Sequence, residues 1–284
     1  MAGVKRPRDS GPVDEPTVVS PYMSMFEAFR DELDEHHDRR ERTIKAARDI
    51  TALSKKMIFS LQRIRHLHRQ IPKPIAAENA ERAATIAKLF TSIVEDVRGI
   101  NAWRYRRQIS GGIQEFVEAV SLEHYLTTQR LISLDEADQR LPAGVQLTED
   151  DYVLGLFDLV GELMRFAITS MATSGSLPRA QRSTPAAAAG SKNSMSHDLH
   201  AAGRDILTDL RSLRSAFESL DTSSSGRNAG LGKEMEQKMG VMKTCVEKVE
   251  NAAYGMIIRG RERPTGWLPD LREDSGGGAE SIAG

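Results

Sequence analysis

The stretch that decides the fold is residues 152–164, YVLGLFDLVGELM. If it is helical, its apolar side chains point in nearly every direction, which is typical of a helix buried on all sides. The exceptions recur at steps of three and four residues and form one narrow polar stripe, made of Gly155, Asp158, Glu162, Arg165 and Thr169. Thr148 is a favourable N-cap followed by acidic residues, so we expect this helix to extend from Thr148 to about residue 173.

Two acidic residues of this stripe have counterparts in a second apolar segment, residues 112–120, GIQEFVEAV. Asp158 and Glu162 are i,i+4 neighbours on a helix, and Glu115 and Glu118 are i,i+3 neighbours, so each pair shares a face. Burying carboxylates without partners is costly. A divalent cation between two facing helices would compensate, and Mg²⁺ prefers oxygen ligands. We therefore predict that these four residues are both the catalytic and the metal-binding residues of a hydrolase in which Mg²⁺ activates water.

The alternative is that the two acidic pairs belong to two independent structural networks. Asp158 or Glu162 would then be neutralised by Arg165 or by an arginine of another helix. Spacing alone is compatible with both interpretations. Four carboxylates on two helices would repel each other strongly in a low-dielectric interior unless cations or protons separate them, and this favours the metal site.

Basic and aromatic residues alternate shortly before the first acidic pair, in residues 103–107, WRYRR. Such interleaving suits contact with phosphates and stacking on bases. We predict RNA-binding roles for Arg104, Arg106 and Arg107, because they precede the first acidic pair by only about ten residues. The many basic residues of segment 39–69 are more simply explained as a solvated helix face.

The pattern of the whole chain is helical. Residues 22–71 contain neither proline nor glycine and repeat apolar residues at helical spacing, which predicts one long amphipathic helix that ends at Pro72 and Pro74. Residues 133–136, SLDE, form a capping-box pattern. Further helices are predicted over residues 78–98, 112–127, 133–141, 148–173, 196–220 and 233–259. We therefore predict an all-α bundle of about six or seven helices with a long N-terminal helix.

The predicted organisation is a single helical domain over residues 21–263 with flexible loops at 174–196 and 222–232, a disordered tail at 1–20 and a C-terminal tail at 264–284. No segment reaches the roughly 18 uncharged apolar residues of a membrane helix, so no membrane association is expected. The single cysteine, Cys245, excludes an internal disulfide and fits a reducing compartment. Residues 5–8, KRPR, are either a weak nuclear-targeting motif or a solvated basic tail, and we expect a cytoplasmic and nuclear location.

Four blocks carry a resemblance to a known family: residues 114–121 (QEFVEAVS), 131–136 (LISLDE), 152–165 (YVLG followed by DLVGELMR) and 248–260 (KVENAAY through the final RG). Over roughly residues 26–260 the chain resembles the translin-associated factor X family of the translin superfamily. Translin itself shares that fold but lacks the acidic set. The resemblance implies an all-α, seven-helix subunit that assembles with translin into a closed hetero-oligomeric barrel. A lone subunit would expose apolar surface, so we expect poor solubility without translin.

The same resemblance implies Mg²⁺-dependent endoribonuclease activity on single-stranded RNA or nicked RNA duplexes. It places Glu115, Glu118, Asp158 and Glu162 on the catalytic and metal-binding positions. The family is associated with passenger-strand removal in RNA silencing and with trimming of transfer-RNA precursor fragments. RNA is therefore the expected ligand, with single-stranded DNA as a second candidate. The alternative function is a non-catalytic scaffold that stabilises translin and binds nucleic acid, and arginines in place of metal at the four carboxylates would favour it.

Overall fold

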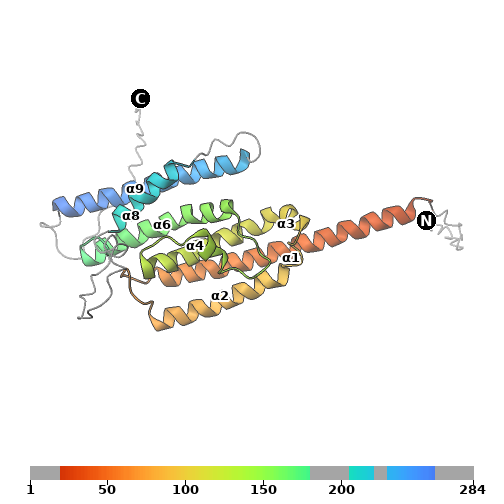
Figure 1. The fold of residues 1–284 in the computed structure, drawn as a ribbon, viewed down its shortest axis with the longest axis horizontal. Helices are drawn as coiled ribbons and strands as arrows, with labels where there is room; N and C mark the ends of the chain where they lie inside the picture. The colour runs from red at the N-terminus through yellow and green to blue at the C-terminus, as the bar shows by residue number, and fades with distance from the viewer. Residues whose placement is uncertain (1–19, 180–204, 221–228, 260–284) are drawn as a thin grey trace, which may run out of the picture. The chain divides into compact units, whose positions relative to one another are not determined.

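The computed structural model describes residues 20–179, 205–220 and 229–259, and within them the regular secondary structure is helical (Figure 1). The helices are α1 (Met23–Leu61), α2 (Lys73–Ile93), α3 (Ile100–Arg104), α4 (Arg106–Thr128), α5 (Leu134–Asp138), α6 (Glu149–Ser174), α8 (Ile206–Glu218) and α9 (Ala229–Arg259). The predicted all-α fold is confirmed. Helix α3, which contains only five residues, is the described helix that was not predicted.

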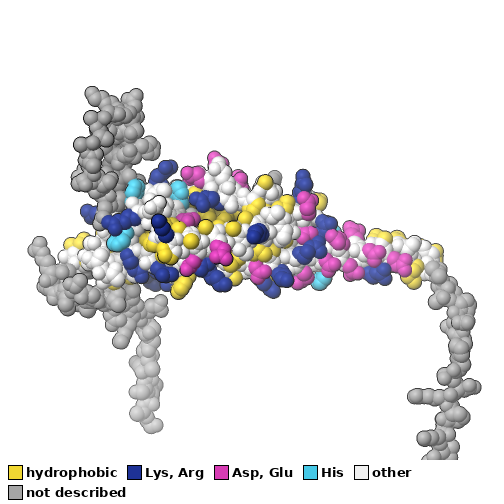
Figure 2. All heavy atoms as spheres, turned by 90° about the horizontal axis from the view of Figure 1, so that it is seen from below, with side chains coloured by type: hydrophobic (Ala, Val, Ile, Leu, Met, Phe, Trp, Pro, Cys, Tyr) yellow, Lys and Arg dark blue, Asp and Glu magenta, His cyan; other side chains and the backbone are white. Residues whose placement is uncertain are grey.

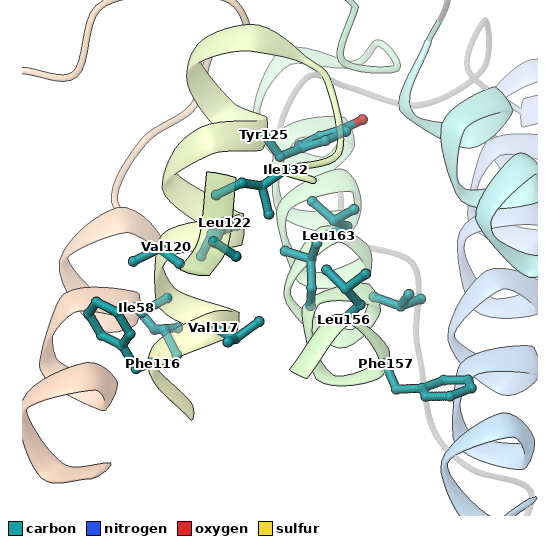
Figure 3. Packing of buried hydrophobic residues seen from close by; sticks show 14 of the residues in the cluster. Ile58, Phe116, Val117, Val120, Leu122, Tyr125, Ile132, Leu156, Phe157 and Leu163 are labelled. Carbon is teal, nitrogen blue, oxygen red and sulfur yellow. The ribbon is translucent and has the colours of Figure 1, made fainter. Parts of the chain in front are cut away.

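Helix α6 is central to the packing because it is apolar on nearly every side. It packs against α4 on one side and against α8 and α9 on another (Figure 1). Leu159, Val160 and Leu163 have no exposed surface. Phe157 points from α6 toward the last helices (Figure 3) and stacks on Phe217 of α8, with ring centroids 4.1 Å apart. The helix predicted from residues 152–164 is therefore buried as expected.

Helix α4 is buried on two faces. Figure 3 shows Phe116 and Val120 on the side that faces Ile58 of α1, whereas Val117 lies on the side that faces α6. All four side chains are buried. Phe116 also meets Phe90 of α2 edge to face, with ring centroids 6.0 Å apart. Because α4 lies between two layers of helices, acidic side chains near its middle lie close to the protein interior.

The chain divides within α1. The segment that ends at Glu41 forms one compact unit, and the segment that begins at Arg42 forms the other, which contains the helices discussed below. In the first unit, Phe26 and Phe29 meet edge to face with ring centroids 6.4 Å apart. Both phenylalanines are exposed. The single domain over residues 21–263 stays a prediction.

The first helix ends ten residues before its predicted end, at Leu61. Beyond it the backbone turns, and the Ile64 amide donates to the Leu61 carbonyl at 2.9 Å. The Arg65 guanidinium donates to the backbone carbonyls of Gln62 and Ile64. The amide bond satisfies the last carbonyl of the helix, and the two arginine bonds hold the turn that follows it. His68 then adopts a left-handed backbone conformation with φ of 55°. Periodicity could not show this end, because apolar residues continue at helical spacing beyond it.

Two further helices begin earlier than predicted. Helix α2 begins at Lys73 and contains Pro74, because proline is tolerated in the first turn of a helix, where its missing amide is not needed. Helix α4 begins at Arg106, so Gly112 lies inside it rather than at its start. A Cβ atom on Gly112 would lie 3.1 Å from the Ala47 carbonyl oxygen. This glycine therefore allows α1 and α4 to approach closely. From the sequence alone, the same glycine was interpreted as the start of a helix.

The caps decide the remaining boundaries. The capping box at Ser133 and the N-cap at Thr148 are confirmed by their side-chain hydrogen bonds to backbone amides. Helix α8 begins at Ile206, where the Asp205 side chain accepts the Thr208 amide at 2.9 Å. The predicted helix start at residue 196 lies outside the described residues. Helix α9 begins at Ala229, inside the segment 222–232 that was predicted to be a loop.

Residues 1–19, 180–204, 221–228 and 260–284 lie outside the description. Most of the predicted tails and loops, and the basic motif at residues 5–8, fall on these residues. Among the helices described, none combines the length and the apolarity that a membrane span needs.

Candidate functional site

A close contact between α4 and α6 sets the position of the two acidic pairs. A Cβ atom on Gly155 of α6 would lie 2.8 Å from Val117 Cγ1 and 2.9 Å from the Gln114 carbonyl oxygen, so the two helices approach too closely for a larger residue. Val117 lies between Glu115 and Glu118 in α4. Gly155 lies one turn before Asp158 in α6. The two pairs therefore come to the same level of the bundle.

Glu118 is the most buried member of this acidic cluster, defined as Glu115, Glu118, Asp158 and Glu162. Only 8% of its surface is exposed. Burial raises the pKa of its carboxyl group to about 8, and the negative charges of the other three members act in the same direction. The ammonium group of Lys238 opposes this shift. The structure thus brings all four predicted carboxylates within electrostatic reach of each other, and Glu118 carries a proton at neutral pH.

Asp158 has a cation as its partner. Lys238 of α9 places its Nζ 2.6 Å from Oδ1 and 2.5 Å from Oδ2 of Asp158. A charged donor that bridges both oxygens makes a strong, charge-assisted contact. Lys238 also acts on Glu115 and lowers its pKa, against the larger effect of burial, which raises it. One ammonium group therefore interacts electrostatically with several carboxylates of the cluster.

The other two carboxylates also have polar partners at the edge of the cluster. Lys55 of α1 lies 3.6 Å from Glu115 through its Nζ. Gln62, just after α1, donates a hydrogen bond of 2.8 Å from Nε2 to Glu162 Oε2. The same Glu162 oxygen lies 3.6 Å from Nε of Arg165. Part of the structural alternative is therefore present, since Glu162 faces the arginine that the sequence suggested.

The cluster offers the oxygen donors that Mg²⁺ prefers, and a cation would counteract the burial and the repulsion that together raise the pKa of Glu118. Among the described residues, however, no three acidic, histidine or cysteine side chains are arranged so that they could hold a metal ion. The donor chemistry therefore fits the ion, whereas binding would require the side chains, and Lys238 above all, to rearrange.

A pocket of about 220 Å³ opens beside the cluster, between the end of α1, α4 and α6. Its floor is apolar and its edge carries two arginines and the carboxylate of Glu162. The lining residues are Leu61, Gln62, Arg65, Leu122, Leu126, Glu162, Arg165, Phe166 and Thr169. Since Glu162 belongs both to the pocket and to the acidic cluster, a molecule in the pocket would lie next to the carboxylates.

The three arginines predicted to bind RNA have different environments. Arg106 donates hydrogen bonds to the side chains of Thr148 at 2.7 Å and Asp150 at 2.9 Å, so it helps to fix the start of α6. Arg104 and Arg107 are exposed. On the face shown in Figure 2, basic and acidic side chains are interspersed with apolar ones rather than gathered into one basic surface. RNA binding by these arginines stays a prediction.

Three residues that contact the cluster were not predicted from the sequence: Lys55, Gln62 and Lys238. Lys55 was assigned to a solvated helix face. A signal for Lys238 was present, because it precedes the buried residues Met242 and Cys245 by four and seven positions and thus lies on the apolar stripe of its helix. No such signal pointed to Gln62, which approaches Glu162 only through the fold.

The helical fold agrees with the comparisons with known proteins. The profile of the translin family matches residues 38–260, and the chain belongs to the translin family. Within this family it is similar to translin-associated protein X of Mus musculus, with 30% identity over 279 residues that cover 90% of this chain and 85% of the relative. The homolog of Schizosaccharomyces pombe is 29% identical over 235 residues, which cover 82% and 87% of the two chains. The predicted resemblance is confirmed.

Two solved structures share the fold. The crystal structure of AfC3PO aligns with a TM-score of 0.56 and 18% identity, and covers 82% of this chain and 97% of its own. The crystal structure of apo-NeC3PO aligns with a TM-score of 0.52 and 15% identity, and the alignment covers 80% of this chain and 96% of the solved chain. At these identities the likeness concerns the arrangement of the helices.

Proposed function

We propose that this chain is the catalytic subunit of a Mg²⁺-dependent endoribonuclease that assembles with translin and cleaves single-stranded or nicked RNA. The observation that carries the proposal is the convergence of the four carboxylates around Glu118, whose pKa they help to raise to about 8. Its relatives are translin-associated proteins by name. Passenger-strand removal in RNA silencing and processing of transfer-RNA precursor fragments, in the cytoplasm and the nucleus, are the roles that this activity would serve.

The chemistry divides between the ion and the protein. When bound, Mg²⁺ would stabilise the negative charge of the phosphodiester and lower the pKa of water. Glu115, Glu118, Asp158 and Glu162 would hold the ion. Glu118 is also suited to exchange a proton, because general acid and base groups work best when their pKa lies near the operating pH.

The pocket beside Glu162 gives the RNA a place next to these carboxylates. Its apolar floor includes Phe166, and its edge carries Arg65 and Arg165. Such a combination suits an unpaired nucleotide, because the base is apolar on its faces and guanidinium groups bind phosphate. A strand with unpaired bases would therefore be preferred to an intact duplex.

Exposed apolar side chains support a partner. Trp103 and Ile100 on α3 are 82% and 75% exposed, and Tyr254 and Ile257 on α9 are 67% and 72% exposed. Apolar groups gathered at the surface of a chain commonly mark an interaction site. Translin is the partner we propose, which explains why the isolated chain is expected to be poorly soluble.

The test is RNA cleavage by the full chain co-expressed with translin, with Mg²⁺ or with EDTA, and with Glu118→Gln as the variant. Glu123→Gln is a matched control, because Glu123 lies on the same helix and burial also raises its pKa, but Arg140 at 3.9 Å is its partner. We expect cleavage to require Mg²⁺, to disappear in Glu118→Gln and to persist in Glu123→Gln. An assembled complex that binds RNA and leaves it intact under all conditions would refute the enzymatic function.

A second function is favoured by one specific observation, the bridging contact of Lys238 with both oxygens of Asp158. A cluster neutralised by the protein's own cations could serve only to hold α4, α6 and α9 together, in a non-catalytic subunit that stabilises translin and binds nucleic acid. In that case Glu118→Gln would leave RNA processing by the complex unchanged, and Lys238→Met would impair assembly.

A further inference from the structure

We propose that Lys238 is an internal cation that occupies part of the metal position and has to leave Asp158 before a divalent ion can bind the acidic cluster. This inference rests on the proposed function, because it requires that the cluster binds a metal. It assigns to Lys238 the role of a positioning residue that sets the metal affinity of the site.

The geometry makes Lys238 a substitute for an ion. Its Nζ lies 2.6 Å and 2.5 Å from the two oxygens of Asp158, so both are already engaged by a positive charge. Its charge also acts on Glu115 and Glu118. A metal ion bound between α4 and α6 would need these same carboxylates, and the ammonium group would repel it.

The surroundings keep Lys238 at this place. Only 21% of its side chain is exposed, and its helix α9 packs along α6. Met242, one turn further along α9, is buried. Lys238 therefore reaches the cluster from a packed helix face. Lys55 and Arg165 contact the cluster at longer distances, 3.6 Å each, and with more exposed side chains, so they are weaker competitors for an ion.

The two possible roles of Lys238 predict opposite changes in metal affinity. If Lys238 only supports the structure, removing it would leave metal binding unchanged or weaken it by loosening the cluster. If it competes with the ion, removing one positive charge at about 4 Å from a divalent ion would tighten binding about thirtyfold even at the dielectric constant of water, which corresponds to about 2 kcal/mol.

The experiment uses Mn²⁺ alone as the probe, with the full chain co-expressed with translin. Binding is measured by titration calorimetry and by the electron paramagnetic resonance signal of free Mn²⁺, for the wild type and Lys238→Met. Lys243→Met is the matched control, because Lys243 lies on the same helix and forms an ion pair with Glu218 at 3.4 Å, outside the cluster. Lys238→Arg keeps the charge. Glu118→Gln shows which part of the Mn²⁺ binds at the cluster.

We expect Lys238→Met to bind Mn²⁺ about thirtyfold more tightly, and Lys243→Met and Lys238→Arg to show no such gain. Without metal, Lys238→Met should unfold at a lower temperature than the wild type, and Mn²⁺ should raise its unfolding temperature more, because ligand binding stabilises in proportion to affinity. If Lys238→Met fails to assemble, Lys238→Gln provides the same comparison.

Unchanged or weaker Mn²⁺ binding in Lys238→Met, with binding that still depends on Glu118, would overturn the inference and leave the proposed function standing. Absence of Mn²⁺ binding in the wild type and in Lys238→Met would overturn both the inference and the metal site of the proposed function. Failure of the enzymatic function alone has a different signature, since Mn²⁺ would bind more tightly in Lys238→Met while RNA stayed intact.

Discussion

Replacing Glu118 by glutamine should remove a pH dependence of stability from the metal-free protein. The pKa of Glu118 is raised from 4.5 to about 8 by burial and by three neighbouring carboxylates. Between these values the folded state keeps a proton that the unfolded state has lost, so stability falls as the pH rises and the loss is complete above about pH 8. From pH 6 to pH 9 this amounts to about 3 kcal/mol.

Glutamine is neutral at every pH and resembles the protonated carboxyl in shape and hydrogen bonding. The variant should therefore be more stable than the wild type at both pH values, and its advantage in free energy of unfolding should be about 3 kcal/mol larger at pH 9 than at pH 6. The assay is urea unfolding at both pH values, in EDTA and at one protein concentration, because assembly makes stability depend on concentration. Glu123→Gln serves as the comparison outside the acidic cluster.

A free-energy difference between Glu118→Gln and the wild type that is the same at pH 6 and pH 9 would refute the reasoning, because Glu118 would then ionise as an ordinary glutamate. Addition of Mg²⁺ at pH 9 provides a second check. Under the proposed function the ion neutralises the ionised carboxylates, so it should stabilise the wild type and have little effect on the variant.

Three further predictions concern the surroundings of the cluster. Gly155→Ala should lower the free energy of unfolding by about 1–3 kcal/mol by forcing α4 and α6 apart, whereas Gly161→Ala, which has open space on the same helix, should be neutral or stabilising in thermal unfolding. Arg106→Ala should lower thermal stability by releasing the start of α6, while Arg107→Ala should leave stability unchanged and weaken RNA binding in a filter assay; the reverse pattern would contradict both assignments. Thr169→Trp should fill the pocket and slow RNA cleavage severalfold without dissociating the complex with translin, and an unchanged cleavage rate would exclude the pocket as an RNA site.

Local patterns predicted the parts of the fold that depend on neighbouring residues. The caps at Ser133 and Thr148 were recognised because a cap is a contact within one turn of the chain. The end of α1 was missed because its last carbonyls accept backbone amides of the turn that follows, and the Arg65 side chain caps carbonyls of that turn, which apolar periodicity does not report. Gly112 was misinterpreted as a helix start because it permits a close contact with α1, a helix far away in the sequence.

The sequence by itself determined that the chain is helical, that the helix after Thr148 is buried, and that Glu115, Glu118, Asp158 and Glu162 occupy apolar helix faces. These properties follow from spacing along one helix. Only the tertiary structure decided which charges meet, because Lys238 and Asp158 are eighty residues apart and their contact depends on how α9 packs against α6. The raised pKa of Glu118 has the same origin, since burial and the charges of α6 act on it only when the helices are assembled.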